Sequence, residues 1–356
     1  MKTLPIIFLM VLTTCLQAAN SAESARVVSP RLQLATKLQI RDVNLDKIIE
    51  PKLINRLKEQ DARADHPVGT KNFIQRFSDF SFLGVGRNEK CDVYMPSGEW
   101  KNNRPAVLFI HGGGFKGGDK AELRSASVCA DLARAGYVAV SCNYILSTKE
   151  KPGAWPQNIA DCREAVRWMR QNARDLGINP QRIAVAGGSA GGYLALMVGL
   201  TDEKPELGGN PKATISSKVS AVIDMYGVTS SGKYAKDMLV NLGADTDKVF
   251  SPISYVTSKS VPILILHGNA DKTVDIKQSR NLEEALIKNK VDYNFIEVEE
   301  GEHTFDLQGR VGLLNPPSGR GWKLSGTFKG QTESRKSNEA DVKAVVVDFL
   351  ERTIGK

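Results

Sequence analysis

Short apolar runs alternate with helical stretches from Phe80 to the end of the chain, and this alternation narrows the range of folds sharply. Brief, continuous apolar runs are typical of strands buried on both faces of a parallel sheet. The runs are AVLFI (106–110), YVAV (137–140), IAVA (183–186), AVIDM (221–225), PILIL (262–266) and YNFIEV (293–298). Helices are expected near 122–135, 156–176, 190–200, 276–288 and 339–353. With an antiparallel N-terminal hairpin, 80–83 against 92–95, the pattern predicts an α/β fold with a mostly parallel sheet flanked by helices.

Composition supports an ordinary globular chain. The 356 residues are 41% apolar and 25% charged, which excludes a chain disordered throughout. The net charge of +8 is a mild cationic bias that does not by itself indicate nucleic acid. We find no internal repeats, and we expect one catalytic domain over 76–356.

The first residues have the organisation of an export signal. Lys2 precedes the apolar run LPIIFLMVL (4–12), and small residues around Ala19 follow. This run is too short to span a membrane, so we expect a signal peptide over 1–21 and a periplasmic or secreted protein with no stable membrane span. Lipidation at Cys15 is disfavoured because Thr14 is a poor residue just before a lipidated cysteine.

Residues 22–75 predict a helical N-terminal extension. Asp42, Asn44 and Asp46 have the 1-3-5 spacing of a calcium-binding EF-hand loop. However, Lys47 stands where that loop needs glycine, and Leu53 where it needs a bidentate glutamate. A degenerate EF-hand pair, with a looser second copy at 61–72, is the weaker interpretation beside a helical linker. No metal is expected elsewhere.

Four cysteines would remain after cleavage: Cys91, Cys129, Cys142 and Cys162. Their spacing matches no zinc site. Buried free thiols are the favoured interpretation, and a disulfide stays open because export would permit one.

The strongest chemical motif follows the run at 183–186. Gly187-Gly188-Ser189-Ala190-Gly191 leaves a strand and opens a helix, which is the context that a G-x-S-x-G nucleophile turn requires. The glycines allow the sharp turn, and the serine is presented at the positive end of the following helix. Ser189 is therefore the predicted nucleophile.

A second glycine-rich turn, His111-Gly112-Gly113-Gly114-Phe115, follows the run at 106–110. Acyl transfer needs preorganised donors for a tetrahedral oxyanion, and the backbone N–H groups of Gly113, Gly114 and Ala190 could supply them. His111 is expected to brace this turn. A phosphate loop is excluded because no G-K-[ST] ending is present.

The general base can be found largely by elimination. The four histidines are His66, His111, His267 and His303. His66 lies in the extension, His111 belongs to the glycine turn, and His267 ends a strand and is expected to bond locally. His303 follows the last predicted strand, where a nucleophile-turn hydrolase places its base.

The orienting acid should lie between the serine and the histidine. Asp271, after the penultimate predicted strand, is the favoured candidate. Asp275 is the rival, and it is more readily explained as an N-cap for the helix at 276–288. In this scheme Ser189 attacks, His303 transfers the proton, and Asp271 orients the imidazole.

Together HGGGF, GGSAGG, HGNAD and GEHTF resemble the α/β-hydrolase esterases of the hormone-sensitive-lipase type, and more closely the bacterial bifunctional feruloyl and acetyl-xylan esterases. Asp92-Val93-Tyr94-Met95-Pro96 and the stretch 251–256 add to this resemblance. It covers about 80–305 and the last helix. It implies an α/β-hydrolase fold and ester hydrolysis without a metal or organic cofactor. Tyr193 is a departure, since that group often has histidine there.

Aromatic residues beside strand ends are candidates for the substrate pocket: Phe115, Tyr144, Trp155 and Tyr226. The glycine-rich, basic segment 306–336 is expected to be a solvated excursion. The sharper alternative is a basic rim on which Trp322 stacks against a sugar.

The sequence therefore predicts an exported serine esterase that removes acyl groups from small-molecule or polysaccharide esters, with no nucleic-acid partner. A short-chain carboxylesterase or lipase, a serine peptidase of the same fold, and a non-catalytic hydrolase-fold binding module remain as alternatives. Oligomeric state cannot be inferred from these patterns.

Overall fold

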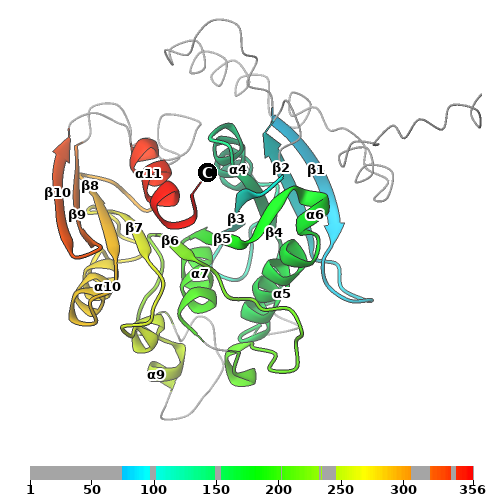
Figure 1. Ribbon diagram of the computed structural model, residues 1–356. Helices are drawn as coiled ribbons and strands as arrows, with labels where there is room; N and C mark the ends of the chain where they lie inside the picture. Colours follow the sequence, from blue (N-terminus) through cyan, green and yellow to red (C-terminus); the bar gives the residue numbers. More distant parts are fainter. Residues whose placement is uncertain are drawn as a thin grey trace, which may run out of the picture.

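One ten-stranded sheet runs through the centre of the protein (Figure 1). The computed structural model describes residues 74–96, 102–148, 154–201, 203–231, 234, 246–305, 321–337 and 342–355. The strands lie in the order β1-β2-β4-β3-β5-β6-β7-β8-β9-β10. Their bounds are β1 Ile74–Ser81, β2 Lys90–Pro96, β3 Arg104–Ile110, β4 Val138–Cys142, β5 Ile178–Gly188, β6 Ala221–Met225, β7 Ile263–Gly268, β8 Tyr293–Val298, β9 Trp322–Phe328 and β10 Gln331–Ser337.

Strands β3 to β8 are parallel to one another, and they coincide with the six apolar runs of the sequence. The two outer members of this set, β4 and β8, pair antiparallel with β2 and β9. The predicted N-terminal hairpin is β1 with β2, which pair antiparallel. Its first strand begins at Ile74, slightly before the predicted start of the catalytic domain. The predicted fold class is confirmed.

Helices cover both faces of the sheet (Figure 1). Their bounds are α4 Leu123–Arg134, α5 Gln157–Gln171, α6 Ala173–Leu176, α7 Ala190–Leu200, α9 Thr246–Phe250, α10 Lys277–Lys288 and α11 Val342–Ile354, with 3-10 turns at Pro205–Leu207 and Pro252–Tyr255. Apolar side chains of α5, α7 and α10 share one core with one side of the strands. Those of α4 and α11 share a second core with the other side. Because both faces are covered, the central strands β4, β6 and β7 are buried along their whole length and are mostly apolar.

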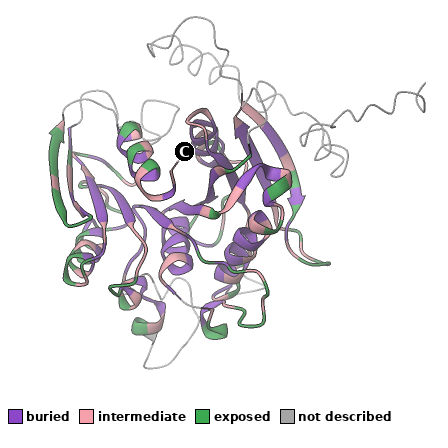
Figure 2. Cartoon of the chain, viewed as in Figure 1, coloured by how far each residue is buried: buried purple, intermediate pink, exposed green. Residues whose placement is uncertain are grey.

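The segment after β8 differs from its sequence prediction. Residues 321–337 are a hairpin, not a solvated excursion, and its first strand pairs antiparallel with β8. Lys329 and Gly330 form its turn with φ values of 49° and 77°. A two-residue hairpin turn requires two left-handed residues. The dipeptide Lys329-Gly330 was therefore the sequence feature from which this hairpin could have been predicted. The outer strand, β10, is mostly exposed (Figure 2). Residues 306–320 lie outside the described residues.

Trp322 is a core residue, and its predicted place in the substrate pocket is wrong. It pairs with Val298 of β8 and is only 2% exposed. Its ring belongs to the core beneath α11, together with Phe305 and Phe349. The guanidinium of Arg335 covers it, 5.4 Å from the ring centroid. A ring enclosed in this way cannot stack on a sugar.

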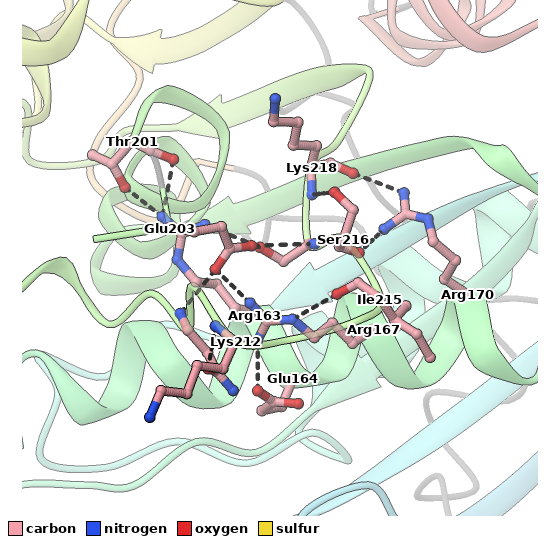
Figure 3. Close-up of polar contacts among 12 residues, drawn as sticks. Arg163, Glu164, Arg167, Arg170, Thr201, Glu203, Lys212, Ile215, Ser216 and Lys218 are labelled. Carbon is pink, nitrogen blue, oxygen red and sulfur yellow. Dashed lines mark hydrogen bonds and ion pairs between the residues drawn. The ribbon is translucent and has the colours of Figure 1, made fainter. Parts of the chain in front are cut away.

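The connection from α7 to β6 is fastened to α5 by arginines (Figure 3). Arg163 is almost fully buried, and it donates to the Ser217 hydroxyl (3.1 Å) and the Thr201 carbonyl (3.0 Å). One turn later, Arg167 forms an ion pair with Glu203 (2.5 Å). Since positions four apart lie on one side of a helix, both side chains reach the same connection.

The same connection touches the first turn of α5. Gly208 has a φ of +72°, and a Cβ there would lie 2.8 Å from the carbonyl of Pro156. Burial raises the pKa of Glu203, but hydrogen bonds from Ser217 and from the Asn210 amide, with Arg167, lower it to about 2. Glu203 is therefore ionised at neutral pH, and its ion pair with Arg167 holds the connection from α7 to β6 against α5.

Candidate active site

Ser189 lies at the turn between β5 and α7 with a φ of 56°. This left-handed conformation is strained for a residue with a Cβ, and such strain clusters at functional sites. The Ser189 N–H donates to the carbonyl of Met225 (2.9 Å), which holds the turn. A Cβ on Gly187 would collide with the carbonyl of Gly191, and one on Gly191 with that of Ile110. The serine is thus presented, half-buried, at the positive end of α7.

The structure brings together the three residues predicted as nucleophile, base and acid. His303 Nε2 lies 2.9 Å from Ser189 Oγ, and His303 Nδ1 lies 2.7 Å from Asp271 Oδ2. The rival carboxylate, Asp275, instead accepts from the backbone N–H of Lys277 (2.9 Å) at the start of α10. Nδ1 faces a carboxylate and therefore carries the hydrogen, which leaves Nε2 able to accept the serine proton.

Asp271 is held by four N–H donors. Oδ1 accepts from the backbone amides of Thr273 (2.8 Å) and Val274 (2.9 Å), and Oδ2 from the imidazoles of His303 and His267. Its side chain is fully buried. Burial raises the pKa of Asp271, but hydrogen bonds from His267, His303 and Val274 outweigh it and hold the pKa below its usual range. The group is therefore a carboxylate at neutral pH.

The predicted oxyanion turn lies against the nucleophile. A Cβ on Gly112 would come 2.9 Å from the Gly188 carbonyl and 3.4 Å from Ser189 Cβ. Gly113 and Gly114 follow with φ values of +107° and +60°, and both are exposed. Because these conformations need glycine, the backbone can approach a substrate closely beside Ser189. Ala190 is the first residue of α7, directly after the nucleophile.

His111 and Tyr144 lie beneath this turn. His111 Nδ1 donates to the Gly112 carbonyl (2.7 Å), and its ring stacks on Tyr144 with centroids 4.4 Å apart. The Tyr144 hydroxyl donates to the His111 carbonyl (3.1 Å). Burial lowers the pKa of His111, so its ring is neutral. Tyr144, predicted as a pocket wall, is 2% exposed and supports the turn from below.

A buried lysine fastens the far end of the same loop. Lys120 Nζ lies 2.8 Å from both Asp79 and Asp92. Burial lowers the pKa of Lys120, but its hydrogen bonds to the two carboxylates leave that pKa raised. Arg76 also binds Asp92 (2.5 Å). The loop that carries the predicted oxyanion glycines is thereby tied to the β1–β2 hairpin.

A closed aromatic cluster lies next to the glycine turn and α7. Tyr193, one turn after the nucleophile, stacks on Phe250 (4.6 Å) and meets Phe115 edge-on (5.5 Å). Trp155 Nε1 donates to the Tyr193 hydroxyl (2.9 Å). All four side chains are buried. Phe115 and Trp155, which were predicted as pocket-wall residues, are enclosed in this cluster. The contacts of Tyr193 and Phe250 within it were not predicted, because no motif marks them.

Tyr226, another predicted pocket residue, lies against the imidazole of His303. Its ring meets that of His303 edge-on at 5.0 Å, and its φ of 45° is left-handed. It is fully buried. Tyr226 therefore packs behind the base and does not form an open pocket wall.

The four cysteines at 91, 129, 142 and 162 are buried and free. Within the described ranges, no cluster of three or more His, Cys, Asp or Glu side chains could hold a metal ion, and no helix is long and apolar enough to cross a membrane. The predicted signal peptide, His66 and the EF-hand-like positions Asp42, Asn44 and Asp46 lie outside those ranges.

Comparisons with known proteins point to esterases. The BD-FAE family model matches residues 91–286, which include Ser189 and Asp271. Esterase LipC of Mycobacterium tuberculosis is 28% identical over 219 residues, 57% of this chain and 53% of LipC. Esterase LipQ of the same organism is 27% identical over 256 residues, 68% of this chain and 60% of LipQ. The chain thus spans little more than half the length of these curated relatives.

Solved structures of esterases are similar to this chain over about the same part of it. A truncated carbohydrate esterase from gut microbiota is 26% identical with a TM-score of 0.57, and the match covers 64% of this chain and 88% of that one. The esterase Est2 of Thermogutta terrifontis is 30% identical with a TM-score of 0.56, over 65% of this chain and 84% of Est2.

Proposed function

Because the chain belongs to the BD-FAE family, we propose that it is a serine carboxylic ester hydrolase that acts through Ser189, His303 and Asp271. The observation that carries the proposal is the position of His303, which bridges Ser189 Oγ and Asp271 Oδ2 at hydrogen-bond distance. The curated relatives and structural neighbours named above are esterases, which supports the same class of reaction.

The geometry suits acyl transfer in two steps. His303 Nε2 accepts the proton of Ser189 as its oxygen attacks the ester carbonyl, and Asp271 stabilises the imidazolium that forms. The oxyanion is met by the backbone N–H groups of Gly113, Gly114 and Ala190. His303 then donates its proton to the leaving alcohol. In the second step His303 activates a water, which releases the acid and restores Ser189.

For the substrate we propose acyl esters of carbohydrates, such as acetylated or feruloylated glycans. The motif resemblance to feruloyl and acetyl-xylan esterases supports this, as does the neighbour that is a carbohydrate esterase. A short-chain carboxylesterase is the second candidate, because Est2 has been solved with propionate and with butyrate bound.

We further propose that the chain is exported and loses residues 1–21. The support is Lys2 followed by the apolar run at 4–12 and the small residues around Ala19. Mass spectrometry of protein recovered outside the cytoplasm should show a chain that begins at Ala22. Recovery of the intact N-terminus would contradict export by this signal.

The central experiment measures release of acid from several esters by the wild-type chain and Ser189→Ala. Acetylated xylan, methyl ferulate and a series of aryl esters from acetate to octanoate separate the two substrate classes. Loss of the nucleophile should lower kcat by about 100,000-fold or more. An organophosphate should also label Ser189 in the wild-type chain and not in the variant.

The outcomes distinguish the alternatives. Faster turnover of glycan esters than of any aryl ester supports the carbohydrate substrate, and the reverse supports a short-chain carboxylesterase. Turnover of amides but not esters indicates a peptidase. A chain that neither hydrolyses esters nor reacts with the organophosphate is a binding module, and the proposal fails.

A further inference from the structure

A second histidine contacts the acid of the candidate triad. His267 is in β7, one residue before its end, and is fully buried. Its Nε2 lies 3.1 Å from Asp271 Oδ2 and 2.9 Å from the Val274 carbonyl. Its Nδ1 lies 2.7 Å from the hydroxyl of Ser279 on α10, which is also fully buried. Each ring nitrogen of His267 therefore has a protein partner.

These partners determine where the proton of His267 lies. Nε2 faces two acceptors, a carboxylate oxygen and a carbonyl oxygen, so it must carry the hydrogen. Nδ1 faces a hydroxyl group, which can donate to it, so the neutral ring satisfies every contact. His267 is thus an Nε2–H tautomer that donates toward Asp271. It cannot serve as the general base, because neither nitrogen is free and neither faces Ser189.

The two imidazoles share one oxygen of Asp271. His303 donates to Oδ2 from one side (2.7 Å) and His267 from another (3.1 Å), while Oδ1 accepts from the amides of Thr273 and Val274. Rotation about the Cβ–Cγ bond of Asp271 moves both oxygens, so the two amides on Oδ1 already oppose it. The donor at His267 adds a contact on Oδ2, the oxygen that faces His303, and so restricts that rotation further.

The groups that face this carboxylate are few. Among the described residues, His267 and His303 are the titratable side chains bonded to Asp271. Tyr226 packs edge-on against both imidazoles, at 6.4 Å from His267 and 5.0 Å from His303. The loops themselves are joined by the Ala270 N–H, which donates to the Gly301 carbonyl (2.9 Å). Loss of the His267 donor therefore should not separate the loops.

We propose that His267 is a positioning residue for the catalytic acid, and that Ser279, His267, Asp271, His303 and Ser189 form one continuous hydrogen-bonded series. The proposal rests on the proposed ester hydrolase function. His267 acts through Asp271 and does not touch the substrate. Ser279 extends the series to α10, so this helix takes part in orienting the base.

The test uses a matched pair of substitutions in the full chain. The amide nitrogen of glutamine can replace Nε2 of histidine, whereas that of asparagine reaches only the place of Nδ1. His267→Asn should lower kcat by about tenfold to a hundredfold with KM changed by less than about twofold, because orientation of the base is lost and substrate contacts are kept. His267→Gln should stay within about threefold of wild-type kcat. Melting temperatures of both variants report any general loss of stability.

A measurement without substrate separates this proposal from the proposed function. The chain has four histidines, so long-range ¹H–¹⁵N correlation spectra of the rings can be assigned by single substitutions. In the wild-type chain His267 should be the Nε2–H tautomer. The signal of the His303 Nδ1 proton should move in His267→Asn and return toward its wild-type position in His267→Gln.

An Nδ1–H tautomer at His267 overturns the proposal, as do equal losses of kcat in the two variants. If His267→Asn fails to fold, the wild-type tautomer and Ser279→Ala decide the matter. Ser279→Ala should displace the His267 ring signals and lower kcat by about threefold. Unchanged ring signals in Ser279→Ala would refute the hydrogen-bonded series. A wild-type chain with the expected tautomer but no ester turnover leaves His267 in its position and refutes only the hydrolase function.

Discussion

Two buried carboxyl groups lie at the ends of the adjacent strands β6 and β7, and they differ in the number of donors that face them. Asp271 has four N–H donors. Asp224 Oδ1 accepts a hydrogen bond from the Gly227 amide (2.9 Å), and among the described residues its Oδ2 has no hydrogen bond. Burial raises the pKa of Asp224 to about 7, because the single amide only partly opposes it. For Asp271 the donors outweigh burial and the pKa is lowered.

The comparison shows that burial alone does not decide the charge of a carboxyl group. Asp224 is buried in β6, and the side chain of Asp271 is buried in the turn after the neighbouring strand β7. The donors decide, because a carboxylate without them loses its hydration and gains nothing in return. Asp271 can thus remain charged and stabilise an imidazolium, whereas Asp224 carries a proton over much of the neutral range.

The largest expected difference between the two residues is in kcat when each carboxyl group is replaced by an amide. Asp271→Asn should lower kcat by about 1,000- to 10,000-fold, because an amide stabilises the imidazolium poorly and can favour the wrong tautomer of His303. Asp224→Asn should leave kcat within about threefold, because no described contact joins Asp224 to His303. Steady-state kinetics on one ester checks both variants. Similar losses in the two would mean that Asp224 also serves the base.

The contributions of the two carboxyl groups to stability should also change with pH in opposite directions. The folded pKa of Asp224, about 7, lies above its ordinary value of 3.8, so the folded state binds the proton more tightly. The contribution of Asp224 to the stability of the folded chain is then fully present below about pH 4 and is lost as the pH rises to about 7. Asp224→Asn should remove this loss, worth up to about 4 kcal/mol at pH 8.

Urea unfolding of the wild-type chain and Asp224→Asn at pH 4.5, 6 and 8 measures this effect. The difference in the free energy of unfolding should grow with pH and then level off. A difference that stays constant with pH would show that Asp224 is already ionised in the folded protein.

The opposite sign is expected for Asp271. Its folded pKa is below the ordinary value of 3.8, so its contribution to stability is present above about pH 4 and is lost as the pH falls further. Asp271→Asn should therefore lower the free energy of unfolding by about 2 kcal/mol at pH 7, because hydrogen bonds to a charged group are lost. The decrease should be smaller at pH 3. Urea unfolding of the wild-type chain and Asp271→Asn at pH 7 and pH 3 checks this expectation. A larger decrease in the free energy of unfolding at pH 3 than at pH 7 would contradict it.

Much of the fold follows from local patterns. The six apolar runs became parallel strands because strands covered on both faces need continuous apolar residues. The turns at 111–115 and 187–191 were predictable since each needs glycine for a left-handed backbone or a close contact with a neighbouring chain segment. The β9–β10 hairpin was missed because β10 consists of polar residues and β9 is defined by its pairing with β8. Trp322 was misplaced for the same reason.

Local sequence was sufficient to propose Ser189, His303 and the oxyanion glycines, because strand–turn–helix geometry is encoded within a few residues. The state of each acid depended on contacts across the fold. Asp224 and Asp271 both lie between the nucleophile and the base in the chain, and no spacing tells how many donors meet each one. The donors of Asp271 come from its own turn, from β7 and from the loop after β8, and they meet only when the sheet is assembled. A carboxyl's charge depends on its surroundings in space, so it cannot be read from residue order.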